Sequence, residues 1–178
     1  MDSFMEMGTT FRHNEIITAL LRKIVNLAER KDTRILHENC SLVYWGKPTE
    51  LDTLGLINID KIKDIEYFKE EVMSELRRVE PDFMLFDKNG YIENIKRTRI
   101  AGFPDLVIEI WSQGNSDMEQ ELKKFLYATS PATEHWYIKQ DSNDVECYIG
   151  SEVLPPQSLK NILRTQNGVE FDLKYMAI

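Results

Sequence analysis

An acidic residue lies inside the most apolar segment of this chain. Residues 104–112 read PDLVIEIWS, and the β-branched and aromatic side chains that follow the proline predict a buried strand. Glu109 stands within its apolar run. Because burying an ionised carboxylate without a partner is very costly, such a group is paired, protonated or bound to a metal ion. The chain must therefore fold so that a partner for Glu109 comes within reach.

A second Pro-Asp pair, ending at Asp82, precedes another short apolar segment at 83–86. We assume that this segment pairs antiparallel with the first strand and that Phe86 lies opposite Asp105. Asp82 then lies opposite Glu109, and directly opposed residues share a face, with Cβ atoms about 5 Å apart. Two carboxylates at that separation can share one metal ion. Asp105 points to the same face as Glu109 but lies about 13 Å away along the strand, at roughly 3.3 Å per residue.

Each of these residues also has an ordinary structural interpretation. An aspartate that follows a proline, such as Asp82, is typical of a turn or a cap. Alternation along an edge strand would expose Glu109 to solvent. Lys123 lies on a helix expected at 116–129, where it can pair with Glu119 at i,i+4. Taken singly these interpretations are favoured, but two acids on neighbouring strands with a lysine near them favour a divalent metal site for phosphodiester chemistry.

The composition is that of an ordinary soluble protein. The chain has 178 residues, of which 42% are hydrophobic and 29% charged, and this predicts one domain over 1–178. No apolar run approaches the roughly 20 residues that span a bilayer, and the first ten residues lack the apolar core of a secretory signal. Cys40 and Cys147 form no CxxC pair, so we expect two reduced thiols in a cytoplasmic protein with no membrane partner.

The formal net charge of −8 argues against a non-specific nucleic-acid coat, because such proteins are usually basic. It does not exclude a nuclease, since a metal site requires acids of its own and a local basic patch can serve the phosphates. The basic runs at 77–78 and 96–99 are candidates for that patch. An ordinary solvated face is the favoured interpretation of both.

The order of predicted elements indicates an α/β or α+β domain with one central mixed β-sheet flanked by helices. Helices are expected at 11–30, 60–78 and 116–129, and strands within 33–45, 83–86, 91–95, 104–112, 134–139, 145–149 and 168–175. Ser116 is expected to cap the third helix. The apolar face of that helix is expected to comprise Met118, Leu122, Phe125 and Leu126.

Four segments carry a family resemblance: Pro81-Asp82, GFPDLVIEIWS at 102–112, ELKKFLY at 121–127 and EHWYI at 134–138. Their order and spacing resemble the Uma2 family, also called DUF820, which is similar to restriction endonucleases of the PD-(D/E)XK superfamily. The resemblance implies a restriction-endonuclease-like fold and a Mg²⁺- or Mn²⁺-dependent endonuclease that acts on DNA.

The resemblance also implies roles for individual residues. Asp82 and Glu109 would hold the metal ion, and Lys123 would orient water or neutralise the phosphate. Asp105 would bind the ion through water or support the end of the strand. In the superfamily pattern the lysine lies two residues after the glutamate, a position that Trp111 occupies here. In Uma2-like proteins the lysine lies on the following helix instead.

Two neighbouring lysines compete for that position. In the family pattern the lysine lies four residues before a tyrosine. The resemblance therefore selects Lys123, four residues before Tyr127, and we expect its ammonium group to face the acids while Lys124 points to solvent. Glu15 is the acidic candidate on the first helix. Because it lies nearly opposite the apolar stripe of that helix, we leave it out of the metal site.

Two departures from the family pattern keep a second hypothesis open. The stretch at about 46–80 is enlarged and predicts an insertion, and the segment 112–114 reads SQG rather than the family's SPS. With the acidic net charge, the altered segment allows a catalytically degenerate nuclease-fold domain that only binds a partner, because a fold does not determine function. A homodimer also stays open.

Overall fold

The computed structural model describes residues 3–23, 33–37, 41–44, 78–87, 91–94, 99–102, 104–128 and 130–178. In chain order the described elements are α1 (Ser3–Arg22), β1 (Thr33–His37), β2 (Ser41–Tyr44), β3 (Arg78–Val79), β4 (Phe83–Asp87), β5 (Tyr91–Asn94), β6 (Arg99–Gly102), β7 (Leu106–Trp111), α4 (Asp117–Ala128), β8 (Glu134–Lys139), β9 (Asp144–Ile149), β10 (Glu152–Val153), β11 (Gln157–Ser158), β12 (Ile162–Arg164), β13 (Glu170–Asp172) and the 3-10 helix η4 (Lys174–Met176). The helix expected at 60–78 and most of the insertion expected at 46–80 lie outside the described residues. No helix among the described elements is long and apolar enough to cross a membrane.

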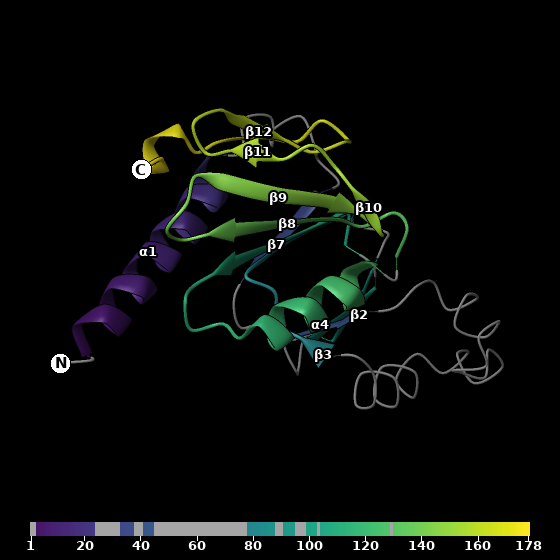
Figure 1. The fold of residues 1–178 in the computed structure, drawn as a ribbon. Helices are drawn as coiled ribbons and strands as arrows, with labels where there is room; N and C mark the ends of the chain where they lie inside the picture. Colours follow the sequence, from purple (N-terminus) through teal and green to yellow (C-terminus); the bar gives the residue numbers. More distant parts are fainter. Residues whose placement is uncertain are drawn as a thin grey trace, which may run out of the picture.

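A mixed sheet forms the centre of the structure (Figure 1). Its strand order is β1-β4-β7-β8-β9-β10, and β11 also pairs with β9. β7 and β8 run parallel, whereas the other neighbours in this sheet are antiparallel. β3, β2, β6 and β5 form a second sheet, and β12 pairs with β13. The expected α+β architecture with a central mixed sheet flanked by helices is confirmed.

The register between β4 and β7 is the one assumed from the two Pro-Asp pairs. Phe83 lies opposite Ile108, and the strands are antiparallel. One residue further along, this register sets Asp82 opposite Glu109. The strand pairing therefore brings the two acids to neighbouring positions on one face of the sheet.

The helices α1 and α4 cover opposite faces of the central sheet (Figure 1). On one face, Ile16 and Leu20 of α1 belong to the same buried core as Ile108 of β7. On the other face, Val107 of β7 is buried with Tyr127 of α4. Consecutive residues of β7 thus point into different cores, as the alternation of a strand requires. All six residues of β7 are buried.

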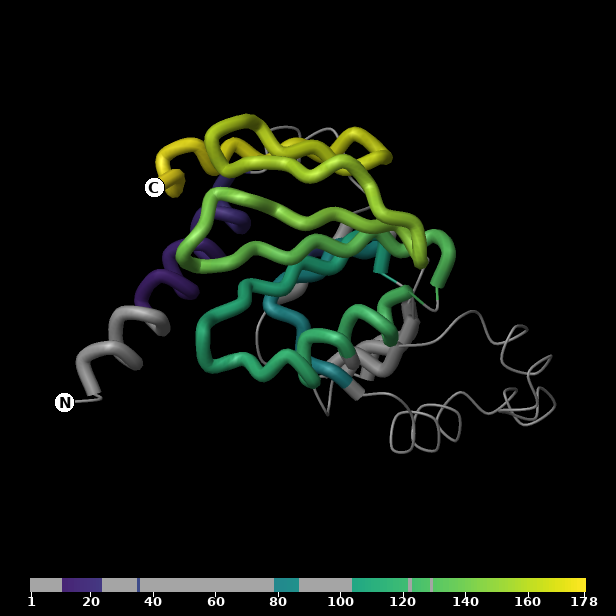
Figure 2. The backbone as a smooth tube through the Cα atoms, in the orientation of Figure 1, coloured from purple at the N-terminus to yellow at the C-terminus, as the bar shows by residue number. Residues whose placement is uncertain are grey.

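The C-terminal segment lies against α1 on the same side of the molecule (Figure 2). Arg12 donates a hydrogen bond to the carbonyl oxygen of Met176, and the N–H of Asp172 donates to the carbonyl oxygen of Lys23 at 3.1 Å. Phe171 is fully buried in the core that α1 covers. These contacts hold the first helix in place relative to the sheet.

The helix α4 begins where the sequence predicts, because the N–H of Glu119 donates to Ser116 Oγ at 3.2 Å. The expected apolar face is wrong at Met118 and Phe125, since each of these residues is 73% exposed. Tyr127, on another face of the helix, is 0% exposed. The face that meets the sheet is therefore rotated from the one that hydrophobicity alone indicates. The reason is polar, because Lys123 and Lys124 of this helix face glutamates of the sheet.

We expect Gly150→Ala to destabilise the protein by about 2 kcal/mol or more, since the left-handed backbone region costs an L-residue roughly 1–2 kcal/mol before any clash. Gly150 has φ +53°, and a Cβ there would lie 2.8 Å from the Cα of Pro131. Gly114→Ala is the control, because its added Cβ would meet only Ser112 Oγ at 3.5 Å. Urea unfolding should place this control within about 0.5 kcal/mol of wild type. Equal effects of the two substitutions would contradict the prediction.

Candidate active site

Glu109 is completely buried, and α4 supplies the partners that its burial requires. Lys123 Nζ lies 2.8 Å from Glu109 Oε2, and Tyr127 donates its hydroxyl hydrogen to Glu109 Oε1 at 2.6 Å. The edge-strand interpretation of Glu109 is wrong, because β7 lies between β4 and β8 and Glu109 is 0% exposed. Lys123 and Tyr127 reach the same carboxylate because residues four apart lie on one face of a helix.

Burial raises the pKa of the Glu109 carboxyl to about 7. The positive charge of Lys123 acts against this shift, and the negative charge of Asp82 adds to it. Burial is the largest single influence on Lys123 and alone would lower its pKa, but the charge and hydrogen bond of Glu109, with the charges of Asp82 and Glu119, together raise it. A raised pKa favours the neutral form of Glu109 but the charged form of Lys123. Burial weighs more on Glu109 because its side chain is 1% exposed, whereas that of Lys123 is 19% exposed. The ammonium group therefore stays protonated, whereas the carboxyl titrates near neutral pH.

Asp82 is held between β7 and α1. Its Oδ2 accepts a hydrogen bond from the N–H of Ile110 at 2.7 Å, which continues the β4–β7 contact just before β4 begins. Its Oδ1 lies 3.1 Å from His13 Nε2, on α1. One oxygen of Asp82 therefore accepts a hydrogen bond from the neighbouring strand β7, while the other faces a histidine of α1.

Asp82, Glu109 and Lys123 line one cavity of about 350 Å³, together with His13 and Gln140. The expectation that Lys123 faces the acids is confirmed. The three predicted residues come from the start of β4, the middle of β7 and the middle of α4, and the fold brings them to one place. Whether they act in catalysis stays a prediction.

The structure does not bring Asp105 to this cavity. Its side chain is exposed, and it is absent from the residues that line the cavity. Its backbone N–H donates to the carbonyl oxygen of Leu85, and its own carbonyl oxygen accepts from the N–H of Glu134. These bonds join three strands, which agrees with support of the strand end. The distance along β7 explains why Asp105 and Glu109 do not meet, and a metal role for Asp105 stays an untested prediction.

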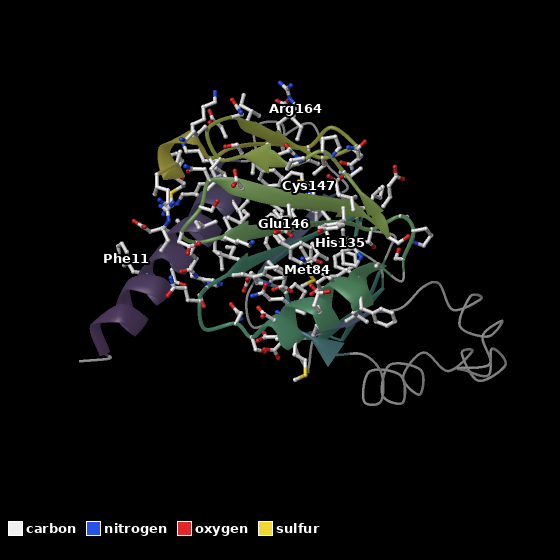
Figure 3. All side chains as sticks on the ribbon, viewed as in Figure 1. Phe11, Met84, His135, Glu146, Cys147 and Arg164 are labelled. Atoms are coloured by element: carbon white, nitrogen blue, oxygen red, sulfur yellow. The ribbon has the colours of Figure 1, made fainter. Side chains whose placement is uncertain are left out.

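The expectation that Lys124 points to solvent is wrong. Lys124 Nζ lies 3.1 Å from Glu146 Oε2 and between 5.1 and 5.7 Å from the ring centroids of Trp111, Tyr137 and Tyr148. Glu146 is on β9 (Figure 3). Lys123 and Lys124 therefore both face the sheet, each toward its own glutamate. This is why the apolar residues Met118 and Phe125 face away.

A polar and aromatic layer supports the site from behind. His135 and Met84 lie on the α4 side of the sheet (Figure 3). His135 Nδ1 is 2.7 Å from the Tyr137 hydroxyl oxygen, and His135 Nε2 is 2.8 Å from the carbonyl oxygen of Gly150. Because a carbonyl oxygen only accepts, the imidazole carries its hydrogen on Nε2 and accepts from Tyr137 at Nδ1. Burial lowers the pKa of His135, which favours this neutral form.

Sequence reasoning missed three residues of the cavity and its supports. Tyr127 served only to align the lysine, although its position one helical turn from Lys123 could have predicted its contact with Glu109. His13 and Gln140 had no such local signal. His13 comes from the other face of the sheet, and Gln140 follows the next strand, so only long-range packing unites them with Asp82.

The donor set fits a magnesium or manganese ion. Mg²⁺ usually keeps several waters and binds proteins through one or two carboxylates, which Asp82 and Glu109 can provide. Within the described residues, no group of three or more His, Cys, Asp and Glu side chains could hold a metal ion, so a histidine- or cysteine-rich zinc site is not indicated there. Each carboxylate oxygen already contacts a protein donor, but carboxylate oxygens have a second lone pair for an ion.

Comparison with known proteins identifies the family. Residues 63–173, more than half of the chain, match the family model of Uma2, described as "Putative restriction endonuclease". This chain belongs to the Uma2 family. The matched region contains Asp82, Glu109 and Lys123, whereas His13 on α1 precedes it. The family resemblance inferred from the sequence is confirmed.

A solved structure supports the fold. The chain is similar to the crystal structure of "a putative nuclease belonging to DUF820 from Anabaena variabilis ATCC 29413", with a TM-score of 0.57 and 12% sequence identity. The superposition covers 95% of this chain and 81% of the other. At this identity the likeness establishes the shared fold, and the expected nuclease-like architecture is confirmed. No curated protein matches the chain in sequence.

The raised pKa of Glu109 predicts a pH dependence of stability in the metal-free protein. Its folded value of about 7 lies above its ordinary value of 4.5, so the folded state binds this proton more tightly than the unfolded state. The stabilisation is full below the unfolded pKa and is lost as the pH rises through the folded one, a loss of about 3 kcal/mol at roughly 1.4 kcal/mol per pKa unit.

Urea unfolding of wild type and Glu109→Gln, both in EDTA, measures this effect. The difference in unfolding free energy should shift in favour of Glu109→Gln across the window from about 4.5 to about 7, because glutamine has no proton to lose. Parallel pH profiles for the two proteins would contradict the shift assigned to Glu109.

Proposed function

We propose that this Uma2 protein is a Mg²⁺- or Mn²⁺-dependent DNA endonuclease that hydrolyses phosphodiester bonds. The observation that carries the proposal is the meeting of Asp82, Glu109 and Lys123 in one cavity. Two oxygen ligands beside a fixed ammonium group are the elements that metal-assisted phosphodiester hydrolysis requires.

The residues of this chain would divide the work between them. Asp82 and Glu109 would hold the ion, which when bound lowers the pKa of a water molecule and stabilises negative charge on the phosphate. Tyr127 keeps the Glu109 carboxylate in one orientation, and the N–H of Ile110 does the same for Asp82. Lys123 stays protonated, because burial lowers its pKa but the surrounding carboxylates, Glu109 foremost, together raise it further. Lys123 would therefore stabilise charge on the phosphate rather than accept a proton.

DNA is the proposed substrate because the family is described as "Putative restriction endonuclease". The net charge of −8 implies that contacts near the cavity, rather than the overall charge, would hold the nucleic acid. Cys147 is a free and buried thiol, which agrees with the cytoplasmic location that we propose from the sequence. The proposal also includes a homodimer, which sedimentation or light scattering in solution would test.

A catalytically degenerate binding domain is the second candidate, and a specific observation favours it. Both oxygens of Glu109 already have partners from α4, so the buried network is satisfied without an ion. A network of this kind can serve the fold alone, because a buried carboxylate needs such partners in any case. Metal binding and cleavage decide between the two candidates.

The endonuclease proposal predicts that Glu109→Gln lowers the cleavage rate by at least about 100-fold, because the ion's charge stabilisation contributes several kcal/mol to the reaction. The assay follows cleavage of supercoiled plasmid, single-stranded DNA and RNA with Mg²⁺ or Mn²⁺, and EDTA should abolish it. Glu146→Gln is the matched control, since Glu146 also pairs with a lysine of α4 but lies outside the cavity. This control should cleave like wild type.

The binding-domain candidate predicts the opposite set of results. Wild type would then cut none of these nucleic acids with either metal ion, and Glu109→Gln would resemble wild type in every assay. Calorimetry would also detect no binding of Mn²⁺.

The two lysines provide a second matched pair. Lys123→Met should lower cleavage by at least about 100-fold, because a single preorganised charge at a transition state is worth roughly 3–4 kcal/mol. Lys124→Met removes an ammonium group from the next position of the same helix and should keep the cleavage rate. Its loss should appear instead in thermal stability, since Lys124 contacts Glu146 and three aromatic rings. Equal activity of the two variants would remove Lys123 from the mechanism.

A further inference from the structure

Gln140 lies beside the acids because two parallel strands end together. β7 and β8 pair in parallel with Trp111 opposite Lys139, so their carboxyl ends meet at one edge of the sheet. Gln140 follows β8 directly, and its N–H donates to the carbonyl oxygen of Trp111 at 3.0 Å. Its side chain lines the same cavity as Asp82 and Glu109.

The carboxamide of Gln140 is buried without full hydrogen bonding. Gln140 is 9% exposed, and its Oε1 has no hydrogen-bond partner within the described structure. A buried acceptor without a donor costs the free energy of its lost hydration. Such groups are rare in native proteins, and each calls for a specific explanation, including a bound ion or water. A methionine would fill a similar space without this cost, so packing alone does not account for glutamine here.

The chemistry of the cavity indicates what Gln140 Oε1 would bind. Asp82 and Glu109 are two charged ligands, and Mg²⁺ or Mn²⁺ also accepts neutral carbonyl oxygens of glutamine side chains. Asp82 and Glu109 already bring two carboxylates to this cavity. A third carboxylate would add to the repulsion between them, whereas a neutral carbonyl oxygen adds a ligand without adding repulsion. The terminal torsion of glutamine is broad, so Oε1 can turn toward the cavity that the side chain lines.

We propose that Gln140 is a third oxygen donor to the metal ion of this site, in addition to Asp82 and Glu109. The inference rests on the proposed function, because it requires that the cavity bind an ion. It assigns Gln140 a role in holding that ion rather than in the packing of β8.

Calorimetric titration of the metal-free protein with Mn²⁺ tests the inference without reference to cleavage. Gln140→Met should raise the Mn²⁺ dissociation constant at least about tenfold, which is a loss of roughly 1.4 kcal/mol in binding free energy. Its melting temperature without metal should equal or exceed that of wild type, because the substitution removes an unpaired acceptor. Ser130→Ala is the matched control, since Ser130 Oγ is also buried and unpaired within the described structure but lies outside the cavity. Its Mn²⁺ affinity should be unchanged.

Gln140→Glu tests the same idea in the opposite direction. The added charge should tighten Mn²⁺ binding severalfold and lower the melting temperature without metal, since a buried carboxylate is costly until an ion pairs with it. Unchanged Mn²⁺ affinity in both Gln140 variants would overturn the inference and leave the proposed function standing. Failure of wild type itself to bind Mn²⁺ would overturn both.

Discussion

The contact of Glu109 with Lys123 and Tyr127 is the interaction on which the arrangement of this site depends. A carboxylate in the middle of a buried strand has no access to water, so the element that covers it must supply donors. α4 does so with an ammonium group and a hydroxyl group one helical turn apart. The helix therefore presents a partly polar face to the sheet, and its apolar residues Met118 and Phe125 lie outside.

A second acid–lysine pair shows how burial changes the same chemistry. Lys124 contacts Glu146 on β9 as Lys123 contacts Glu109 on β7. The Glu146 side chain is 34% exposed. Burial is the largest single influence and raises its pKa, but the hydrogen bonds and charges of Lys124 and Lys139 together lower it. For Glu109 burial dominates and raises the pKa to about 7. The exposed pair behaves as an ordinary structural ion pair, whereas the buried carboxyl is poised to change its charge near neutral pH.

The cavity joins groups from both layers that flank the sheet. Lys123 comes from α4 on one face, and His13 comes from α1 on the other, where it contacts Asp82. Asp82 can reach His13 while it lines the same cavity as Lys123, because it lies just before β4, beyond the last residue of β4 that pairs with β7. The contacts between α1 and the C-terminal segment therefore bear on the site, since they help to keep His13 in place. An ion bound in this cavity would therefore depend on residues that α1, the central sheet and α4 hold in place together.

Local sequence determined the strand that carries Glu109. The register that opposes Asp82 to it was assumed from the two Pro-Asp pairs, and the choice of Lys123 came from the family's spacing between lysine and tyrosine. The strand and the shared face of its acids follow from the periodicity of two in strands, which acts within one element or one strand pair. Only the tertiary structure decided which face of α4 is buried and that His13 and Gln140 join the cavity. Side chains far apart in sequence share no periodicity, and their meeting depends on how whole layers pack. Hydrophobicity misplaced the buried face of α4 because the sheet beneath it carries acids that require cations.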